Sequence, residues 1–218
     1  MTQADYFTDR THFLITGVTG ARTNFGGKTA LATWWADTHG RASNDVVLFL
    51  NPKLDDGPEK HADVVARTIR EIATAMSEGA EFICFSPHDA DWSAVSQRFQ
   101  AFVRELPNDM DKMVVLDEAP ELDQDALKWF VRVAGNGNNT KTLVLSQEPG
   151  AVEGRGQCVL IWVGPVQENN RHVFRANKRE NHFEAMQQEH EPYHWSVMLG
   201  PGDEDRDHYN PVPEEYAG

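Results

Sequence analysis

The fold of this chain is decided by the stretch Phe25-Gly26-Gly27-Lys28-Thr29, which follows the apolar run His12–Gly17. Glycines directly before Lys-Thr, where a strand gives way to a helix, are typical of a phosphate-binding loop. In such a loop the backbone amides and the helix N-terminus bind phosphates, the lysine reaches the β- and γ-phosphates, and the threonine hydroxyl binds Mg²⁺. The sequence therefore predicts a nucleoside triphosphate and Mg²⁺ as cofactors.

The loop departs from its common form upstream of the lysine. The usual pattern has a glycine five residues before Gly27, and Arg22 stands there instead. Gly17 and Gly20 lie further upstream, so the loop is longer than usual. Arg22 either adds charge to the phosphates or is an exposed loop arginine. We expect the nucleotide to be bound by Asn24, Phe25, Gly26, Gly27, Lys28, Thr29 and Ala30.

A second apolar run, Met113–Leu116, ends in Asp117 and Glu118. A buried strand with an aspartate at its carboxyl end puts a carboxylate where open α/β sheets bind ligands and metals. Thr29 and Asp117 are thus the predicted metal ligands, and Glu118 is the predicted catalytic base that polarises the attacking water. An Asp-Glu pair alone indicates only a solvated turn, but the upstream Gly-Gly-Lys-Thr favours the nucleotide interpretation.

A third motif ends the predicted strand Thr142–Leu145, where Ser146 and Gln147 follow. A neutral amide at the tip of that strand is suited to contact the γ-phosphate or the attacking water. By itself Ser-Gln indicates a plain turn. As the third motif in this order, Gln147 is a predicted catalytic residue.

Composition indicates one substantial domain, because 218 residues of which 40% are hydrophobic can bury a large core. Apolar runs stay well short of the ~20 residues that a membrane span requires, so we expect no membrane insertion. The polar segment Met1–Arg10 does not resemble a signal peptide, and we expect a cytoplasmic location. Cys84 and Cys158 lie in apolar runs, which favours buried reduced thiols.

The charge is strongly negative, with 34 acidic and 20 basic residues, and arginine outnumbers lysine. An acidic, lysine-poor surface resembles the proteins of salt-accumulating halophiles, in which molar salt shortens the Debye length to ~3 Å. The alternative is an ordinary acidic protein with disordered acidic ends. The acidity argues against a broad DNA-binding face, although it is compatible with a few arginines lining a pore.

Apolar runs alternate with helical patterns along the chain, which predicts an α/β fold with a mainly parallel sheet and helices on both faces. The domain is expected over 12–200, between an N-terminal extension (1–11) and an acidic C-terminal tail (201–218). The segment Lys53–Lys60 is expected to be a polar loop. Predicted strands are His12–Thr16, Val46–Leu50, Glu81–Phe85, Met113–Leu116, Thr142–Leu145, Cys158–Val163, His172–Arg175 and His194–Leu199. Predicted helices are Lys28–Thr38, His61–Ser77, Trp92–Leu106, Asp123–Ala134 and Glu180–Glu191.

The order Gly-Gly-Lys-Thr, Leu-Asp-Glu-Ala and Leu-Ser-Gln-Glu-Pro resembles the FtsK–HerA superfamily of DNA-pumping ATPases. Within it, the chain looks most like the genome-packaging ATPases of viruses with an internal membrane, and the composition points to a haloarchaeal virus. The resemblance covers about residues 12–175. It implies a RecA-like fold of the additional-strand, catalytic-glutamate class, and Mg-ATP hydrolysis. It also implies a ring of five or six copies, translocation of double-stranded DNA, and action at a capsid vertex.

Ring ATPases of this type need an arginine from the neighbouring subunit to stabilise charge on the transferred phosphoryl group. Arg155, between two glycines, is the first candidate, Arg132 is the second, and a solvated surface arginine is the alternative. The densest basic cluster is suited either to DNA phosphates or to a solvated helix start; it comprises Arg171, Arg175, Lys178 and Arg179. Two other functions stay open: a P-loop ATPase or nucleotide kinase that does not act on DNA, and a nucleotide-binding regulatory subunit.

Overall fold

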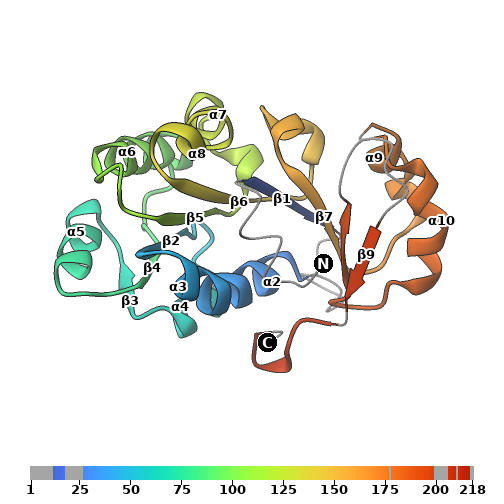
Figure 1. Ribbon diagram of the computed structural model, residues 1–218, viewed down its shortest axis with the longest axis horizontal. Helices are drawn as coiled ribbons and strands as arrows, with labels where there is room; N and C mark the ends of the chain where they lie inside the picture. Colours follow the sequence, from blue (N-terminus) through green and yellow to red (C-terminus); the bar gives the residue numbers. More distant parts are fainter. Residues whose placement is uncertain (1–11, 18–26, 177, 199–205, 210, 217–218) are drawn as a thin grey trace.

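The computed structural model describes residues 12–17, 27–176, 178–198, 206–209 and 211–216. Asn24, Phe25 and Gly26 of the predicted loop, together with Arg22, lie outside the described residues. Within the described part, the strands form one sheet in the order β3-β4-β2-β5-β6-β1-β7-β8-β9 (Figure 1). The strands from β3 to β7 are parallel, and β8 and β9 are antiparallel additions.

The strands and helices have the following bounds. The strands are β1 (His12–Gly17), β2 (Val46–Leu50), β3 (Val64–Ala66), β4 (Phe82–Phe85), β5 (Lys112–Leu116), β6 (Thr140–Ser146), β7 (Val159–Val163), β8 (Trp195–Met198) and β9 (Arg206–Tyr209). The helices are α2 (Lys28–Trp35), α3 (Arg41–Ser43), α4 (Asp56–His61), α5 (Ile69–Ser77), α6 (Trp92–Glu105), α7 (Gln124–Arg132), α8 (Ala134–Gly137), α9 (Arg171–Ala176) and α10 (Glu180–Glu189).

Strand β6 lies between β1 and β5, and this insertion defines the additional-strand topology that the motifs predicted. Because these strands are parallel, their carboxyl ends meet at one edge of the sheet. Gly17, Ser146 and Leu116 end the three strands, so all three sequence motifs begin at neighbouring points of that edge. The predicted RecA-like α/β fold is confirmed.

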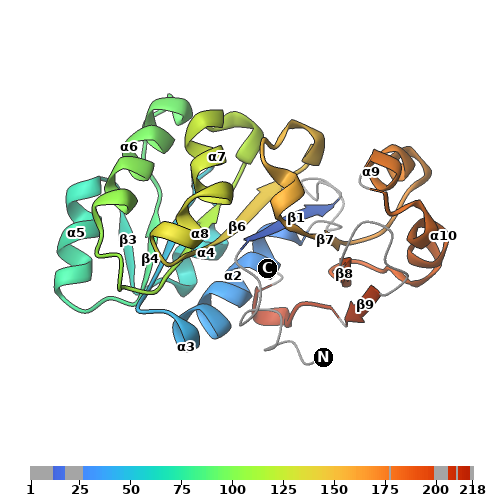
Figure 2. The same ribbon diagram turned by 45° about the horizontal axis from the view of Figure 1, so that its top comes forward.

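Two hydrophobic cores cover the two faces of the sheet, as expected for strands that are apolar on both sides. Helices α5, α6, α7, α9 and α10 contribute to one core, and α2 to the other. Figure 1 shows α6 and α7 over one face and α2 over the other, and the turned view in Figure 2 agrees. Cys84 and Cys158 are both free thiols, but only Cys84 is buried as predicted, whereas Cys158 is partly buried. Their surroundings raise the pKa of the Cys84 thiol to about 11 and that of the Cys158 thiol to about 12.

The predicted helix His61–Ser77 is wrong in its first half, and so is the predicted polar loop Lys53–Lys60. Helix α4 occupies part of that loop and ends at His61, and β3 then pairs with β4. Helix α5 begins only at Ile69, because the hydroxyl of Thr68 caps it by accepting a hydrogen bond from the Glu71 amide (3.2 Å). The β-branched pair Val64-Val65 fits both a helical stripe and a short strand, and pairing with β4 decides between them.

The predicted strand His172–Arg175 is also wrong, because these residues belong to helix α9. Phe174 packs between Trp162 of β7 and Phe183 of α10, with ring centroids 5.0 and 5.3 Å away. This packing anchors α9 on the sheet. The short run lacks the length to distinguish the two periodicities.

Part of the C-terminal segment 201–218, expected to be a tail, packs on the domain. Residues 206–209 form β9 against β8. Val212 is buried in the α2-side core, and the Tyr216 hydroxyl donates a hydrogen bond to Asp37 (2.7 Å). Residues 206–209 therefore extend the sheet, and Val212 and Tyr216 pack on the same face as α2. Among the residues described, no helix combines the length and apolarity needed to cross a bilayer.

Candidate nucleotide and metal site

The structure brings the start of α2 and the end of β5 into direct contact. The hydroxyl of Thr29 donates a hydrogen bond to Asp117 Oδ2 at 3.1 Å, across 88 residues of sequence. A hydroxyl and a carboxylate side by side are the oxygen donors that Mg²⁺ takes together with waters and phosphate oxygens. The donor set therefore fits the predicted metal ion.

Asp117 is buried, with 2% of its surface exposed. Burial and the neighbouring Glu118 raise the pKa of the Asp117 carboxyl to about 6. A buried carboxylate is unfavourable without a cation, and a divalent ion at this position would offset that cost. This electrostatic situation supports the assignment of Asp117 as a metal ligand.

Lys28 is the first residue of α2 and is also buried. Its ammonium lies 3.4 Å from the carbonyl oxygen of Gly17, the last residue of β1. Burial lowers the pKa of Lys28, and the charges of Asp117 and Glu118 act in the opposite direction. The lysine thus lies between the end of β1 and the acidic pair, at the helix N-terminus where phosphate binds.

Glycine is required at two points of this loop. A Cβ on Gly17 would lie 2.0 Å from the Val163 carbonyl oxygen, which no side chain permits. Gly27, which precedes α2, has a φ of 157°, and a Cβ there would lie 2.8 Å from Val163 Cγ1 and 3.0 Å from Tyr193 Cδ1. Gly27, Lys28, Thr29 and Ala30 thus form the described part of the predicted nucleotide-binding segment.

Glu118 follows Asp117 with a left-handed backbone (φ 52°, ψ 43°). Its backbone amide donates a hydrogen bond to Asp117 Oδ1 (2.8 Å), which helps to orient the Asp117 carboxylate. The Glu118 side chain forms an ion pair with Lys53, from the loop after β2. Positive φ at a non-glycine residue is costly and concentrates at functional sites.

The sequence did not predict the role of Asn51, whose hydrogen bonds to Asp55 close the loop that carries Lys53. Asn51 directly follows β2, is fully buried, and donates hydrogen bonds to Ser86 Oγ (3.1 Å) and to the Asp55 carbonyl (2.9 Å). Its side-chain oxygen accepts a hydrogen bond from the Asp55 amide (3.1 Å). The signal available was a polar residue followed by proline after two apolar strands, Asn51-Pro52 and Ser86-Pro87.

Gln147 is exposed and directly follows β6, the strand between β1 and β5. Its position at the tip of that strand is the one the sequence predicted, and its contact with phosphate or water stays a prediction. The preceding Ser146 is buried and accepts a hydrogen bond from the Glu148 amide (3.0 Å).

Arg155 and Arg132, the two candidates for the arginine that a subunit supplies to its neighbour (the arginine finger), lie on one surface. Arg155 is exposed and donates to the carbonyl oxygens of Gly150 (3.0 Å) and Val152 (3.4 Å), so its guanidinium rests on its own loop. Arg132, at the end of α7, is exposed with its Nε 3.3 Å from where a Gly154 Cβ would lie. Both arginines are thus exposed near Gly154, and Arg155 is held there by its own loop.

The predicted basic cluster is largely paired with acids. Arg171 pairs with Glu168 (2.7 Å) and Arg175 with Glu180 (2.8 Å), whereas Arg179 is buried. Lys178 is exposed. These pairs weaken the case for the cluster as a DNA contact, and its role stays a prediction.

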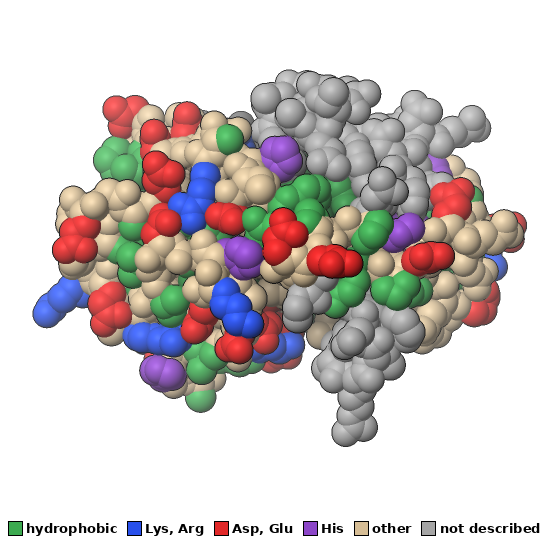
Figure 3. All heavy atoms as spheres, turned by 90° about the horizontal axis from the view of Figure 1, so that it is seen from below, with side chains coloured by type: hydrophobic (Ala, Val, Ile, Leu, Met, Phe, Trp, Pro, Cys, Tyr) green, Lys and Arg blue, Asp and Glu red, His purple; other side chains and the backbone are tan. Residues whose placement is uncertain are grey.

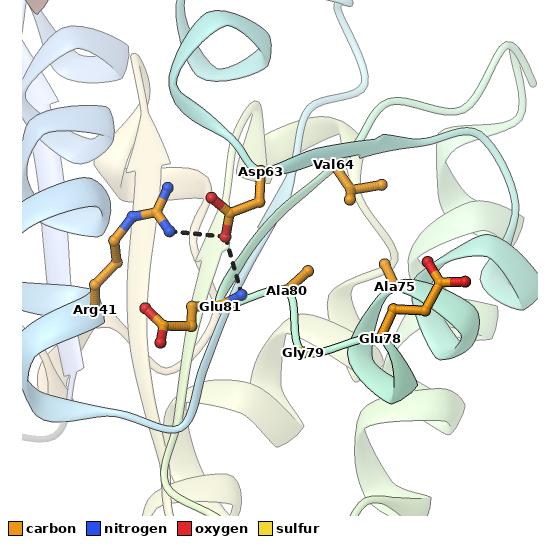
Figure 4. Close-up of a pocket in the computed structure, with 8 residues that line it drawn as sticks. All are labelled: Arg41, Asp63, Val64, Ala75, Glu78, Gly79, Ala80 and Glu81. Carbon is orange, nitrogen blue, oxygen red and sulfur yellow. Dashed lines mark hydrogen bonds and ion pairs between the residues drawn. The ribbon is translucent and has the colours of Figure 1, made fainter.

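A pocket of about 440 Å³ lies elsewhere, at the amino-terminal ends of β3 and β4. Figure 4 shows Arg41 pointing toward Asp63, whose carboxylate accepts from Arg41 (2.7 Å) and from the Glu81 amide (2.9 Å). Open α/β sheets bind ligands at the opposite, carboxyl edge. We therefore interpret this ion-paired hollow as structural.

The fold is similar to that of solved viral packaging ATPases. The DNA-packaging ATPase B204 from Sulfolobus Turreted Icosahedral Virus superimposes with a TM-score of 0.66 at 11% identity, covering 93% of this chain and 98% of that one. The genome packaging NTPase B204 of Sulfolobus turreted icosahedral virus 2 was solved in complex with ATP-γS and with sulfate. These two structures give TM-scores of 0.65 and 0.66 at 10% and 11% identity, over 94% and 93% of this chain and 98% and 97% of theirs.

No protein-family model and no curated protein matches the chain in sequence. At these identities the likeness establishes the fold, and it agrees with the predicted resemblance to genome-packaging ATPases at that level.

Proposed function

We propose that this chain is a Mg²⁺-dependent ATPase of the FtsK–HerA type that translocates double-stranded DNA into a viral capsid. The observation that carries the proposal is the contact between Thr29 and Asp117, which joins the phosphate loop to the acidic pair. The similarity to B204, described as a DNA-packaging ATPase, supports the choice among P-loop functions. The acidic composition supports an origin in a haloarchaeal virus. In this proposal the protein acts as a ring in the host cytoplasm, at the packaging vertex of the capsid.

In the proposed hydrolysis each site residue has its own role. Lys28 and the amides at the start of α2 bind the β- and γ-phosphates. Thr29 and Asp117 would hold Mg²⁺, which supplies positive charge to the phosphoryl oxygens. Glu118 orients and deprotonates the attacking water, a role that contributes roughly 10²–10⁴-fold in rate. Because Glu118 is paired with Lys53, that ion pair has to open before the carboxylate can serve as the base.

The remaining catalytic roles lie at the edges of the site. Gln147 contacts the γ-phosphate or the attacking water from the tip of β6. Arg155 acts on the neighbouring subunit's phosphates, with Arg132 as the second candidate. Arg155 has to leave the carbonyl oxygens of Gly150 and Val152 to reach a neighbour.

The test is ATP turnover measured with and without double-stranded DNA in molar KCl. We expect DNA to stimulate turnover, and Glu118→Gln to abolish turnover while ATP binding persists. Turnover that ignores DNA but requires a second small substrate would instead identify a nucleotide kinase. ATP binding without any turnover would identify a regulatory subunit, and either result contradicts the proposal.

A further inference from the structure

The sheet order defines where the nucleoside end of a bound nucleotide must lie. Asp117 and Glu118 follow β5, which is two strands from β1 on one side. A triphosphate bound at the start of α2 with its γ end at these acids has its other end directed away from β5. That direction leads past β7 to β8, on the opposite side of β1.

Tyr193 lies at this position. It precedes β8, and because β8 is antiparallel to β7, its start meets the carboxyl edge of the sheet. The ring is half-exposed and its Cδ1 lies 3.0 Å from where a Cβ of Gly27 would be. An aromatic ring therefore lies beside Gly27, the residue that precedes the helix N-terminus proposed to bind phosphate.

The backbone holds Tyr193 in an unfavourable conformation. Its φ is 64°, which is unusual for a bulky residue and has to be maintained by the surroundings. The neighbouring His194 carbonyl accepts a hydrogen bond from the Gly164 amide (2.7 Å), and the Tyr193 carbonyl accepts one from Val212 (3.3 Å). Gly164, which follows β7, and Val212 of the C-terminal segment thus hold the backbone at Tyr193 and His194.

We propose that Tyr193 is the stacking platform for the nucleobase of the bound triphosphate. Stacking on one aromatic face tolerates every base, because each base has a π-face. The site should therefore distinguish nucleoside triphosphates strongly from inorganic tripolyphosphate, and purines from pyrimidines only weakly. This inference rests on the proposed nucleotide site, but not on hydrolysis or on DNA.

The test compares binding of the non-hydrolysable analogue AMP-PNP with binding of inorganic tripolyphosphate, both with Mg²⁺ in molar KCl, by isothermal titration calorimetry. Tyr193→Leu keeps an apolar side chain on Gly27 but removes the aromatic face. We expect it to raise the Kd of AMP-PNP about tenfold and to change that of tripolyphosphate by less than about twofold. Tyr193→Trp should retain AMP-PNP binding.

Tyr216→Leu is the matched control, since Tyr216 is another half-buried aromatic on the same core but stacks on His61 of α4 and donates a hydrogen bond to Asp37, beyond the C-terminal end of α2. It should leave both ligands unaffected. Equal weakening of AMP-PNP and tripolyphosphate by Tyr193→Leu would mean that the ring only packs the phosphate loop, and unchanged binding of both would put the base elsewhere. Either result overturns the inference while the nucleotide site stands. A parent protein that binds neither ligand would contradict the proposed function itself.

Discussion

At the scale of single residues, Asp117 has a buried carboxylate, which is energetically unfavourable, at the position proposed to bind the metal ion. Its carboxylate is buried and accepts hydrogen bonds from Thr29 and from the Glu118 amide. Replacing it by an amide of the same shape removes the buried charge, while the Thr29 hydroxyl can turn to accept from the new amide. Burying charge at such a site lowers stability, so the residue is explained by ligand binding and not by folding.

We therefore predict that Asp117→Asn stabilises the nucleotide-free protein while abolishing ATP turnover. The gain in the free energy of unfolding should be on the order of 1–3 kcal/mol. Urea denaturation and an ATPase assay on the same preparation measure the two effects. A variant that is less stable than the parent would show that the carboxylate has a structural role.

Lys53 gives the second prediction at this scale. The Lys53 side chain is 39% exposed, so its ion pair with Glu118 is worth no more than about 1 kcal/mol. If Glu118 is the base, Lys53→Met frees it and should raise DNA-independent turnover up to about fivefold. Steady-state kinetics check this, with Lys60→Met, an exposed lysine in the following helix α4, as the control. Reduced turnover in Lys53→Met would mean that the lysine assists catalysis instead of restraining the base.

At the scale of elements, β1 carries a histidine that makes the fold sensitive to acid. His12 begins β1 with 8% exposure, and burial lowers its pKa to about 4. In the unfolded chain the group titrates near its ordinary value of 6.5. Between these values the unfolded state binds the proton and the native state does not, so lowering the pH favours unfolding.

We predict that the free energy of unfolding falls as the pH is lowered from about 6.5 to about 4, with His12 responsible for up to about 3 kcal/mol. The contribution is fully present above pH 6.5. His12→Leu should flatten this part of the profile, measured by denaturant unfolding at successive pH values. An equal slope in parent and variant would assign the acid sensitivity to other groups.

Strands that are apolar on both faces were predictable from sequence, whereas β3 and α9 were not. Strands β1, β2 and β5 are buried on both faces, so each appears in the sequence as an uninterrupted apolar run. Strand β3 has three residues and α9 has six, and neither is long enough to display its own period. In these cases tertiary packing decided the structure.

The same contrast applies to the site. The proximity of Lys28, Thr29, Asp117 and Glu118 was predictable because each belongs to a local motif at the end of an apolar strand. The partnership of Lys53 with Glu118 spans 65 residues and exists only because β2 lies next to β5. Tyr193 lies beside Gly27 because it precedes β8, which pairs antiparallel with β7. No local sequence pattern predicts this contact.

At the scale of the whole molecule, the net charge of −14 sets the response to salt. Carboxylates spread over the visible face in Figure 3 instead of gathering in one patch. Their mutual repulsion is screened when salt shortens the Debye length from ~10 Å at 0.1 M to ~3 Å at 1 M. We predict that the melting temperature rises with KCl over this range, measured by circular dichroism. Choline chloride at equal ionic strength should act similarly, and a fall in melting temperature would contradict a repulsion-dominated surface.

The proposed ring requires two copies for each active site, because the arginine finger is supplied by the neighbouring subunit. Glu118→Gln lacks the base but keeps its arginine, whereas Arg155→Ala keeps the base but lacks the finger. Neither variant alone should hydrolyse ATP at the parent rate, since a trans arginine is worth roughly 10³-fold or more. In a ring assembled from both, a site with Glu118 can meet an intact arginine from its neighbour.

We therefore predict that mixing the two inactive variants in molar KCl restores DNA-stimulated turnover. At equal proportions about one quarter of the interfaces combine a complete base with a complete finger, which limits recovery to about that fraction of the parent rate. Arg132→Ala, tested in the same mixture, identifies which arginine on the shared surface acts. If mixing restores nothing for either arginine although size measurement shows mixed rings, the active site is complete within one copy and the trans finger is wrong. If the parent is a fully active monomer in this salt, the ring itself is excluded as a requirement for hydrolysis.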